Sequence, residues 1–278
     1  MSHPAPPPSP DQQGPRSRPE TGSGHHASAD PLFDMRGRVV IVAGAAGGLG
    51  RALATALHDR GARLGLLDLS DPDLAGMQRH LPGAMTAAVD IRDEAALTHA
   101  VATCSARLGE PDAAINATGI LTPAPALDLP EEALRRTLEV NVLGAFLFSR
   151  VIARRMMEAG AEGSILHLAS VSSMVANEGY AAYSPSKAAL SQMVRVLARE
   201  WAPEGVRVNA IGPSLAQTDM TRAALADPAH QAETLKLIPM GRFCEGGDLI
   251  GPAVMLLSDA GRYITGQTLY VDGGRTLT

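Results

Sequence analysis

The chain has 278 residues, of which 45% are hydrophobic and 19% charged, proportions that are ordinary for a soluble globular protein. Its formal net charge of -5 gives no electrostatic reason to expect nucleic acid or an anionic membrane as a partner, and no apolar run is long enough to span a bilayer. Cys104 and Cys244 are too few and too far apart for a disulfide framework or a metal site, so we expect a reducing cytoplasm and no metal.

The N-terminal segment 1–34 is rich in Pro, Ser, Gly and His and has almost no apolar side chains before Leu32. Such a composition buries too little surface to offset the entropy lost on ordering, which predicts a disordered tail. The segment has no apolar h-region, and its acidic residues argue against a transit peptide. Residues 35–278 are enough for one large α/β domain.

From Arg38 onward, short aliphatic runs alternate with longer helical patterns. Strands are predicted at Val39–Ala43, Arg63–Leu67, Met85–Val89, Ala113–Asn116, Ser164–Ala169, Arg207–Ile211 and Thr268–Val271. Helices are predicted at Arg51–Arg60, Glu94–Leu108, Glu131–Ala159, Ala188–Trp201 and Asp248–Leu257. Strands that alternate with helices of this length pair in parallel, because each crossover returns over the sheet. The fold class is therefore α/β: a single-domain, doubly wound parallel sheet of about seven strands with helices on both faces.

The first predicted strand leads into a glycine-rich turn with glycines at Gly44, Gly48 and Gly50, followed by a helix. Glycines let the backbone approach a phosphate, to which a helix start presents unpaired N–H groups. The turn could also be a simple tight turn or hold a different nucleotide.

Asp68, at the end of the second predicted strand, indicates which nucleotide the turn holds. A carboxylate there can accept both ribose hydroxyls of NAD and would repel the 2′-phosphate of NADP. No lysine or arginine at positions 45–47 or 69–70 could pair with such a phosphate. The alternative is that Asp68 caps a turn or a helix, since Asp71-Pro72 follows closely.

Tyr183 and Lys187 stand four residues apart in a chain that has only two lysines. In a helix this spacing puts the phenol and the ammonium on the same face. A neighbouring cation lowers the pKa of a tyrosine from near 10 toward the range in which the phenol exchanges a proton with an alcohol or a ketone. The alternative is a solvated pair on a helix surface.

Together these motifs resemble the short-chain dehydrogenase/reductase family, and the resemblance extends from Arg36 to the C-terminus. The glycine spacing matches that family's cofactor loop, Asn116-Ala117-Thr118-Gly119 resembles its Asn-Asn-Ala-Gly segment, and Ser170 lies thirteen residues before Tyr183. Segments 265–267 and 271–274 resemble its C-terminal signature. The resemblance implies a Rossmann-like fold, NAD as cofactor, a small-molecule substrate, and a homotetramer with a homodimer as the fallback.

The resemblance also implies roles for single residues. Tyr183 would be the general acid/base, and Lys187 would lower its pKa and bind the nicotinamide ribose. Ser170 would hold the substrate oxygen, and Asn141 would anchor a water path from Lys187 toward solvent. Taken singly, Ser170 and Asn141 could be ordinary polar residues of a strand end and a helix. The residues expected to bind the cofactor are Gly44, Gly48, Leu49, Gly50, Asp68, Leu69, Asp90, Ile91, Asn116, Gly119, Tyr183, Lys187, Pro213, Leu215 and Thr218.

Three positions depart from the family pattern. Ala43 stands in place of the usual threonine, Ala117 in place of the second asparagine, and Ser214 in place of a glycine. The first two changes remove hydrogen bonds that brace the neighbouring turns. None removes a catalytic group, so the departures concern local rigidity more than activity.

The segment from about 214 to 240 is predicted to form a lid, because it overhangs the carboxyl end of the sheet where ligands bind. It is largely apolar, which suits a neutral substrate, although lid residues also pack against their own domain. We therefore expect an oxidoreductase that transfers a hydride between NAD(H) and a secondary alcohol or ketone. The alternatives are an NADP-dependent 3-oxoacyl-type reductase, against which Asp68 argues, and a non-catalytic NAD-binding sensor, against which Ser170, Tyr183 and Lys187 argue.

Overall fold

The sheet of this protein is parallel throughout. The computed structural model describes residues 30–218, 220–222 and 224–278. Its strands are β1 (Val39–Ala43), β2 (Arg63–Asp68), β3 (Met85–Ala88), β4 (Ala113–Asn116), β5 (Gly163–Leu168), β6 (Val206–Pro213) and β7 (Thr268–Val271), in the order β3-β2-β1-β4-β5-β6-β7. The strand order changes direction between β1 and β4, and in open α/β sheets ligands bind at the carboxyl edge of that point. The predicted fold class is confirmed.

Burial on both faces explains the aliphatic composition of the central strands. All five residues of β1 and all four of β4 are buried, whereas the edge strands β3 and β7 are mostly half-buried. Alternate side chains of β1 enter opposite halves of the core: Val40 and Val42 pack on one side, and Val39 and Ile41 on the other. Parallel sheets need this two-sided cover, so their strands carry continuous apolar runs.

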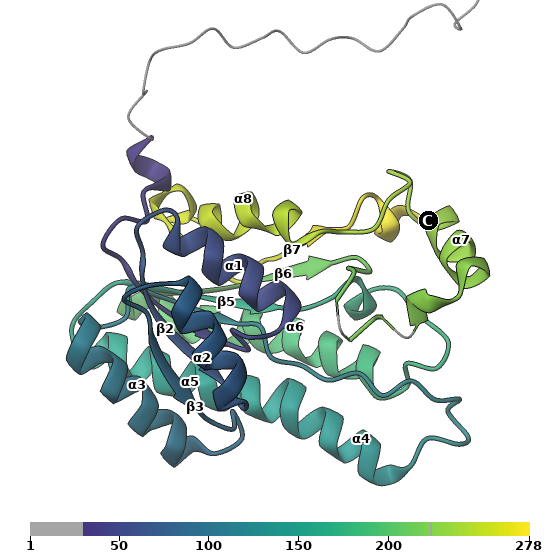
Figure 1. Cartoon of the computed structure of the whole chain (residues 1–278), viewed down its shortest axis with the longest axis horizontal. Helices are drawn as coiled ribbons and strands as arrows, with labels where there is room; N and C mark the ends of the chain where they lie inside the picture. Colours follow the sequence, from purple (N-terminus) through teal and green to yellow (C-terminus); the bar gives the residue numbers. More distant parts are fainter. Residues whose placement is uncertain (1–29, 219, 223) are drawn as a thin grey trace, which may run out of the picture.

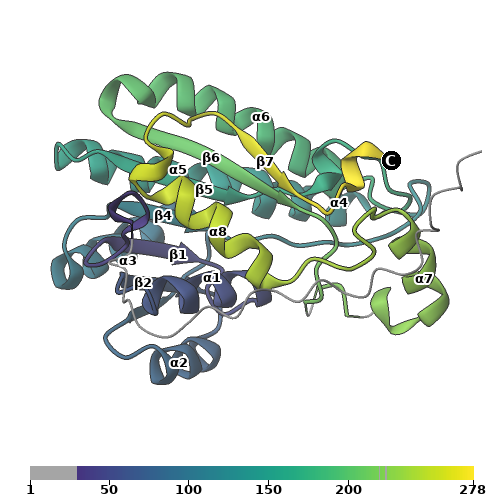
Figure 2. The same cartoon turned by 90° about the horizontal axis from the view of Figure 1, so that it is seen from above.

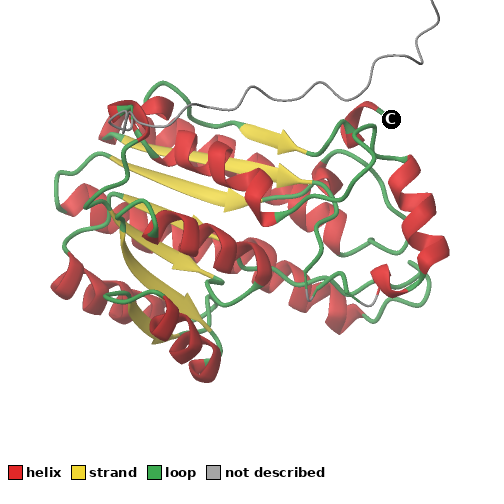
Figure 3. Cartoon of the chain, turned by 45° about the horizontal axis from the view of Figure 1, so that its top comes forward, coloured by secondary structure: helices red, strands yellow, loops and turns green. Residues whose placement is uncertain are grey.

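Helices cover both faces of the sheet. On one face lie α1 (Gly48–His58), α2 (Asp71–His80) and α8 (Gly246–Leu257), and on the other lie α3 (Glu94–Leu108), α5 (Ala145–Glu158) and α6 (Tyr183–Trp201) (Figure 1). The remaining helices are α4 (Glu131–Leu138) and α7 (Pro228–Lys236). The strands point toward the side of the molecule that carries α7 and the C-terminus (Figures 2 and 3). Within the described residues, no helix combines the length and apolar character needed to cross a membrane.

The predicted strands agree with the observed ones to within two residues, whereas the helices differ in several places. The single helix predicted at Glu131–Ala159 is divided by a π-helical turn, Glu139–Gly144. Three helices begin earlier than predicted, α1 at Gly48, α6 at Tyr183 and α8 at Gly246. Neither α2 nor α7 was predicted, because α2 buries only two residues and α7 buries none, so their apolar periodicity is weak.

Most of the predicted tail lies outside the described residues; of the part within them, Pro31–Phe33 form a 3-10 turn. The predicted lid contains α7 and a second 3-10 turn, Ala224–Ala226. Leu225 and Ile238 of this segment are buried against Phe243, so part of its apolar surface packs on itself rather than facing a substrate. Ala216 of the same segment pairs with Cys244, which connects the segment to the residues that precede α8.

Substitution of two glycines, one in a strand and one in a helix, tests how tightly the sheet is packed. A Cβ on Gly65 in β2 would lie 2.6 Å from Ile41 Cδ1 and 3.0 Å from Cys104 Sγ, whereas one on Gly76 in α2 would meet nothing closer than 3.8 Å. We expect Gly65→Ala to lower the free energy of unfolding by about 1–3 kcal/mol through overpacking. Gly76→Ala should raise it by up to about 1 kcal/mol through helix propensity. Denaturant unfolding measures both, and equal effects would contradict the packing described here.

Candidate active site

The glycines of the turn after β1 allow close packing of its backbone. Gly44 has φ +74°, and a Cβ there would lie 2.8 Å from the carbonyl carbon of Ala117. A Cβ on Gly50 would collide with the Gly44 carbonyl oxygen. The helix α1 then starts after Gly47, which has no side chain to cap it, so its first N–H groups stay available to an anion. These features fit the pyrophosphate of a dinucleotide.

Asp68 ties the end of β2 to this turn. One oxygen of its carboxylate accepts the Ala46 N–H at 2.9 Å, and the other accepts the Leu69 N–H at 2.7 Å. The cap of α2 is Ser70, which accepts the Asp73 N–H, so the alternative role of Asp68 as the cap of that helix does not hold. The carboxylate therefore remains at the carboxyl end of β2, half-buried, beside the glycine turn.

Asp90 and Ile91 follow β3. The guanidinium of Arg92 binds both oxygens of Asp90, with Nη2 to Oδ2 at 2.6 Å, and this pairing holds the pKa of the carboxyl below its usual range. Ile91 is buried, and a Cβ on Gly144 would lie 2.7 Å from its Cγ2. Ile91 thus packs against the π-helical turn, while the Asp90 side chain already has a partner.

The expected catalytic residues converge where β5 meets the start of α6. Lys187 is buried, and its Nζ donates to the Leu168 carbonyl at 2.8 Å. The same Nζ lies 5.6 Å from the centroid of the Tyr183 ring. Ser170 begins the 3-10 turn after β5, where its Oγ accepts the Ser172 N–H at 3.1 Å. The predicted shared face of Tyr183 and Lys187 is therefore present, with Lys187 buried and Tyr183 half-buried rather than on a solvated surface.

The predicted lowering of the Tyr183 pKa is wrong for the free protein. Burial raises the pKa of this phenol to about 12, although hydrogen bonding with Ser170 opposes the rise. Burial also lowers the pKa of Lys187 to about 8. The ammonium faces the aromatic ring, and the loss of water around the phenol outweighs its attraction.

Asn141 lies in the π-helical turn and is buried. Its side chain accepts the Ile120 N–H at 2.8 Å and donates to the Ile120 carbonyl and to Ser186 Oγ, both at 3.0 Å. Ser186 in turn donates to the Tyr183 carbonyl at 2.7 Å. The Asn141 side chain thus braces the segment after β4 against the first turn of α6. Its role in a water path stays a prediction.

The other predicted cofactor residues lie around the same edge of the sheet. Gly119 is beside Lys187, since a Cβ there would lie 3.3 Å from Nζ. Pro213 ends β6, and a Cβ on Gly48 would lie 2.9 Å from Thr218 Cγ2. Leu49 and Leu215 are half-buried, and Asn116 is buried. The predicted residues are therefore gathered in one region, and their roles toward a cofactor stay predictions.

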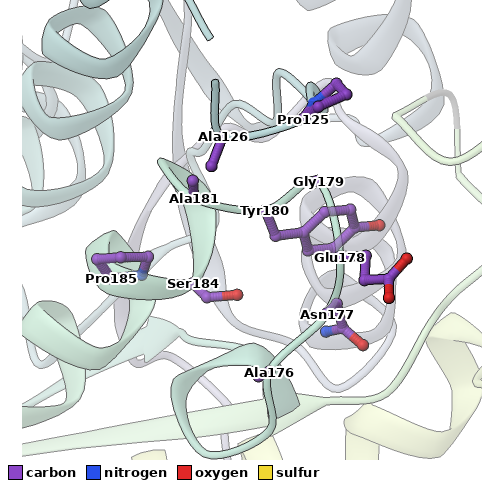
Figure 4. Close-up of a pocket in the computed structure, with 10 residues that line it drawn as sticks. All are labelled: Pro125, Ala126, Ala176, Asn177, Glu178, Gly179, Tyr180, Ala181, Ser184 and Pro185. Atoms are coloured by element: carbon purple, nitrogen blue, oxygen red, sulfur yellow. The ribbon is translucent and has the colours of Figure 1, made fainter. Parts of the chain in front are cut away.

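A pocket of about 530 Å³ adjoins the catalytic helix, between the loop at Pro125–Ala126, segment 176–181 and the first residues of α6 (Figure 4). The ring of Tyr180 packs edge-on against Tyr183, with centroids 5.7 Å apart. The hydroxyl of Ser184 is buried and has no hydrogen-bond partner in the described part of the chain. The sequence predicts the second wall of the site at residues 171–180, which contain Asn177, Glu178 and Tyr180, but it assigns no role to Ser184 beside them.

Comparison with known proteins identifies the family. A family profile described as enoyl-(acyl carrier protein) reductase matches residues 44–276. The chain belongs to the short-chain dehydrogenase/reductase family. The NAD-dependent glycerol dehydrogenase of Listeria innocua is 36% identical over 250 residues, which are 89% of this chain and 97% of that protein. The D-threitol dehydrogenase of Mycolicibacterium smegmatis is 37% identical over 254 residues, 90% of this chain and 97% of that protein.

Solved structures of the family have the same fold. The gluconate 5-dehydrogenase of Burkholderia cenocepacia, solved with NADP and tartrate, superimposes with a TM-score of 0.85 at 30% sequence identity and covers 89% of this chain and 98% of its own. The protein is accordingly an oxidoreductase that acts on CH-OH groups and transfers a hydride between a nicotinamide cofactor and an alcohol or ketone. Its relatives include proteins with either form of the cofactor.

Replacement of Tyr183 by Phe removes one hydroxyl and leaves the ring contacts in place. We expect the kcat for oxidation of an alcohol substrate to fall by about 10²–10⁴-fold, the range for loss of a general acid/base. Binding of the dinucleotide, measured by fluorescence titration, should change little. A Tyr183→Phe variant with a wild-type kcat would remove Tyr183 from the proton transfer.

Lys187 provides a pH-dependent test. Its pKa of about 8 lies below the ordinary 10.5, so the charged form destabilises the fold fully below pH 8, and this cost disappears as the pH rises to 10.5. Lys187→Met should therefore raise the free energy of unfolding by about 3 kcal/mol at pH 7, and by less as the pH rises through that window. Denaturant unfolding with the exposed Lys236→Met as control checks this; destabilisation of the Lys187 variant at pH 7 would contradict it.

Proposed function

We propose that this enzyme interconverts small polyols and the corresponding ketoses, with NAD as its cofactor. The observation that carries the choice of NAD is the Asp68 carboxylate, which lies at the end of β2 beside the glycine turn. Neither Leu69 nor Ser70 offers a positive charge to a 2′-phosphate. Arg51 is near the turn, but its guanidinium donates to the Ala46 carbonyl at 2.8 Å. The carboxylate would accept the ribose hydroxyls of NAD and repel the phosphate of NADP.

The polar side chains beside the catalytic tyrosine support a polyol as substrate. Asn177, Glu178, Tyr180 and Ser184 line the pocket, and the Ser184 hydroxyl has no partner among the described residues. Asn177 already donates to Ser172 Oγ, and the Ser184 oxygen is covered, so the groups open to a ligand are the Glu178 carboxylate and the Tyr180 hydroxyl. A substrate with several hydroxyl groups would hydrogen-bond with them, whereas a purely apolar alcohol would not. Relatives that act on glycerol and threitol agree with this substrate class.

The proposed chemistry assigns one step to each residue. The phenol of Tyr183 gives its proton to the carbonyl oxygen in the reductive direction, and its phenolate takes the proton of the hydroxyl in the oxidative direction. Ser170 Oγ binds the same oxygen, since a hydroxyl can donate or accept as the charge on that oxygen changes. The ammonium of Lys187 favours the phenolate once the proton has left. A bound nicotinamide supplies or accepts the hydride.

We further propose a cytoplasmic homotetramer, or a homodimer as the fallback. Apolar side chains remain exposed on several elements of the described chain, including Leu143 at 48%, Val196 at 45% and Leu269 at 36%. Surplus apolar surface of this kind supports association. The free thiols of Cys104 and Cys244 agree with a reducing compartment. Light scattering of the purified protein tests the assembly.

The test of the proposed function is formation of NADH or NADPH with a panel of substrates: glycerol and sugar alcohols, simple secondary alcohols, hydroxysteroids and 3-hydroxyacyl thioesters. NADH formation with the sugar alcohols is the expected result. Activity with 3-hydroxyacyl thioesters and NADP would favour the 3-oxoacyl-type reductase instead. Dinucleotide binding without turnover of any substrate would favour the sensor.

Asp68→Asn tests the cofactor assignment because it removes the charge and keeps the shape. We expect the ratio of kcat/KM for NAD to that for NADP to fall by tenfold or more, since a repulsion of about 1.4 kcal/mol corresponds to a factor of ten. The amide oxygen can still accept the Ala46 N–H, which holds the glycine turn, whereas the amide nitrogen cannot accept the Leu69 N–H, so that bond is lost. An unchanged ratio would show that Asp68 does not select the cofactor.

A further inference from the structure

His167 is a polar residue that lies fully buried within β5, between the apolar Leu166 and Leu168. Both ring nitrogens are hydrogen-bonded: Nδ1 lies 3.3 Å from Asn116 Nδ2, and Nε2 lies 2.9 Å from Ser149 Oγ. Burial lowers the pKa of the imidazole to about 3, which keeps it neutral in ordinary buffers. The histidine therefore connects α5 to its cross-strand partner Asn116 at the end of β4, along one face of the sheet.

The donor and the acceptor of each hydrogen bond in this network can be assigned, starting from the single hydroxyl proton of Ser149. Ser149 Oγ donates to the Ala145 carbonyl at 2.7 Å, so it accepts from the His167 Nε2–H. The other nitrogen, Nδ1, then carries no proton and accepts from the Asn116 amide. With its amide nitrogen fixed, Asn116 turns Oδ1 toward Thr118 and accepts both the backbone N–H at 3.0 Å and the hydroxyl at 2.6 Å.

The loop 117–119 that this network orients lies between the two halves of the site. On one side Ala117 contacts the glycine turn, where its carbonyl carbon would be 2.8 Å from a Cβ on Gly44. On the other side Gly119 lies beside Lys187 and Asn141. A shift of the loop would therefore disturb the phosphate-binding turn and the surroundings of the ammonium together.

We propose that His167 is a positioning residue for the cofactor site. Its neutral imidazole fixes the rotamer of Asn116 and thereby the loop 117–119, at the place where Ala117 removes a bracing side chain. The network reaches the loop along the face of the sheet that α5 covers, so it can hold the loop without contacting a ligand. This role rests on the proposed binding of NAD, but it predicts effects in the free protein as well.

Three variants of His167 separate the contributions of its two hydrogen bonds. His167→Asn places an amide oxygen close to the position of Nδ1 and keeps an acceptor for Asn116 while losing the bond to Ser149. His167→Gln reaches the position of Nε2 and keeps only the Ser149 end. His167→Leu removes both ends while filling much of the volume. Hydrogen exchange of the peptide spanning 114–121 in the free protein, and fluorescence titration with NAD, are measured for each.

The expected result is faster exchange in that peptide and about tenfold weaker NAD binding for the Leu and Gln variants, with both properties close to wild type for the Asn variant. Wild-type behaviour of the Leu variant, or equal losses in the Asn and Gln variants, would overturn the proposal and leave only a packing role. If the Leu variant does not fold, the contrast between Asn and Gln decides alone. Failure of the wild type to bind NAD would count against the proposed cofactor, while the exchange pattern would still test His167.

Discussion

A buried ammonium is the constraint on which the active site depends. Lys187 is 3% exposed, and its Nζ donates to a carbonyl oxygen, that of Leu168, at 2.8 Å. A carbonyl carries only a partial charge, so this bond does not offset the loss of water around the ammonium, and the pKa falls to about 8. An apolar side chain would suit this position better for stability. The fold therefore carries a local cost in stability at the residue for which we propose a catalytic role, as active sites commonly do.

The parallel topology brings the surroundings of this ammonium together from distant parts of the chain. Leu168 ends β5, Gly119 follows β4, and Asn141 comes from the π-helical turn between α4 and α5. Since all parallel strands end at one edge, the residues that follow them meet there without any local sequence relation. The π-helical turn adds a residue to the helical register. Asn141 in that turn bonds both Ile120 and the first turn of α6, so one side chain links two of the segments around Lys187.

The sequence was sufficient for the sheet and for the grouping of the site, and insufficient where the signal is weak or non-local. Strands such as Val39–Ala43 were predictable because burial on both faces leaves a continuous aliphatic run. The helix α7 was not, because it buries none of its residues and has no apolar stripe to detect. The role of His167 was not predicted because it depends on hydrogen bonds with Asn116 and Ser149, which are far from it along the chain. The Tyr183 pKa was predicted with the wrong sign because spacing indicates a charge but not the loss of water.

That error shows how proton transfer must be arranged in this site. The two pKa shifts have one cause, burial, and each favours the neutral form of its group, the phenol of Tyr183 and the amine of Lys187. A phenolate and an ammonium formed together would stabilise each other, so the two titrations are coupled. The phenol can therefore lose its proton near neutral pH only if its oxygen gains further hydrogen-bond donors. The bond with Ser170 already contributes to the shifted pKa, so the additional donor has to come from a bound ligand. In the proposed mechanism this donor is the substrate hydroxyl, whose proton the phenolate then takes, so the phenolate would form only in the complex in which it is used.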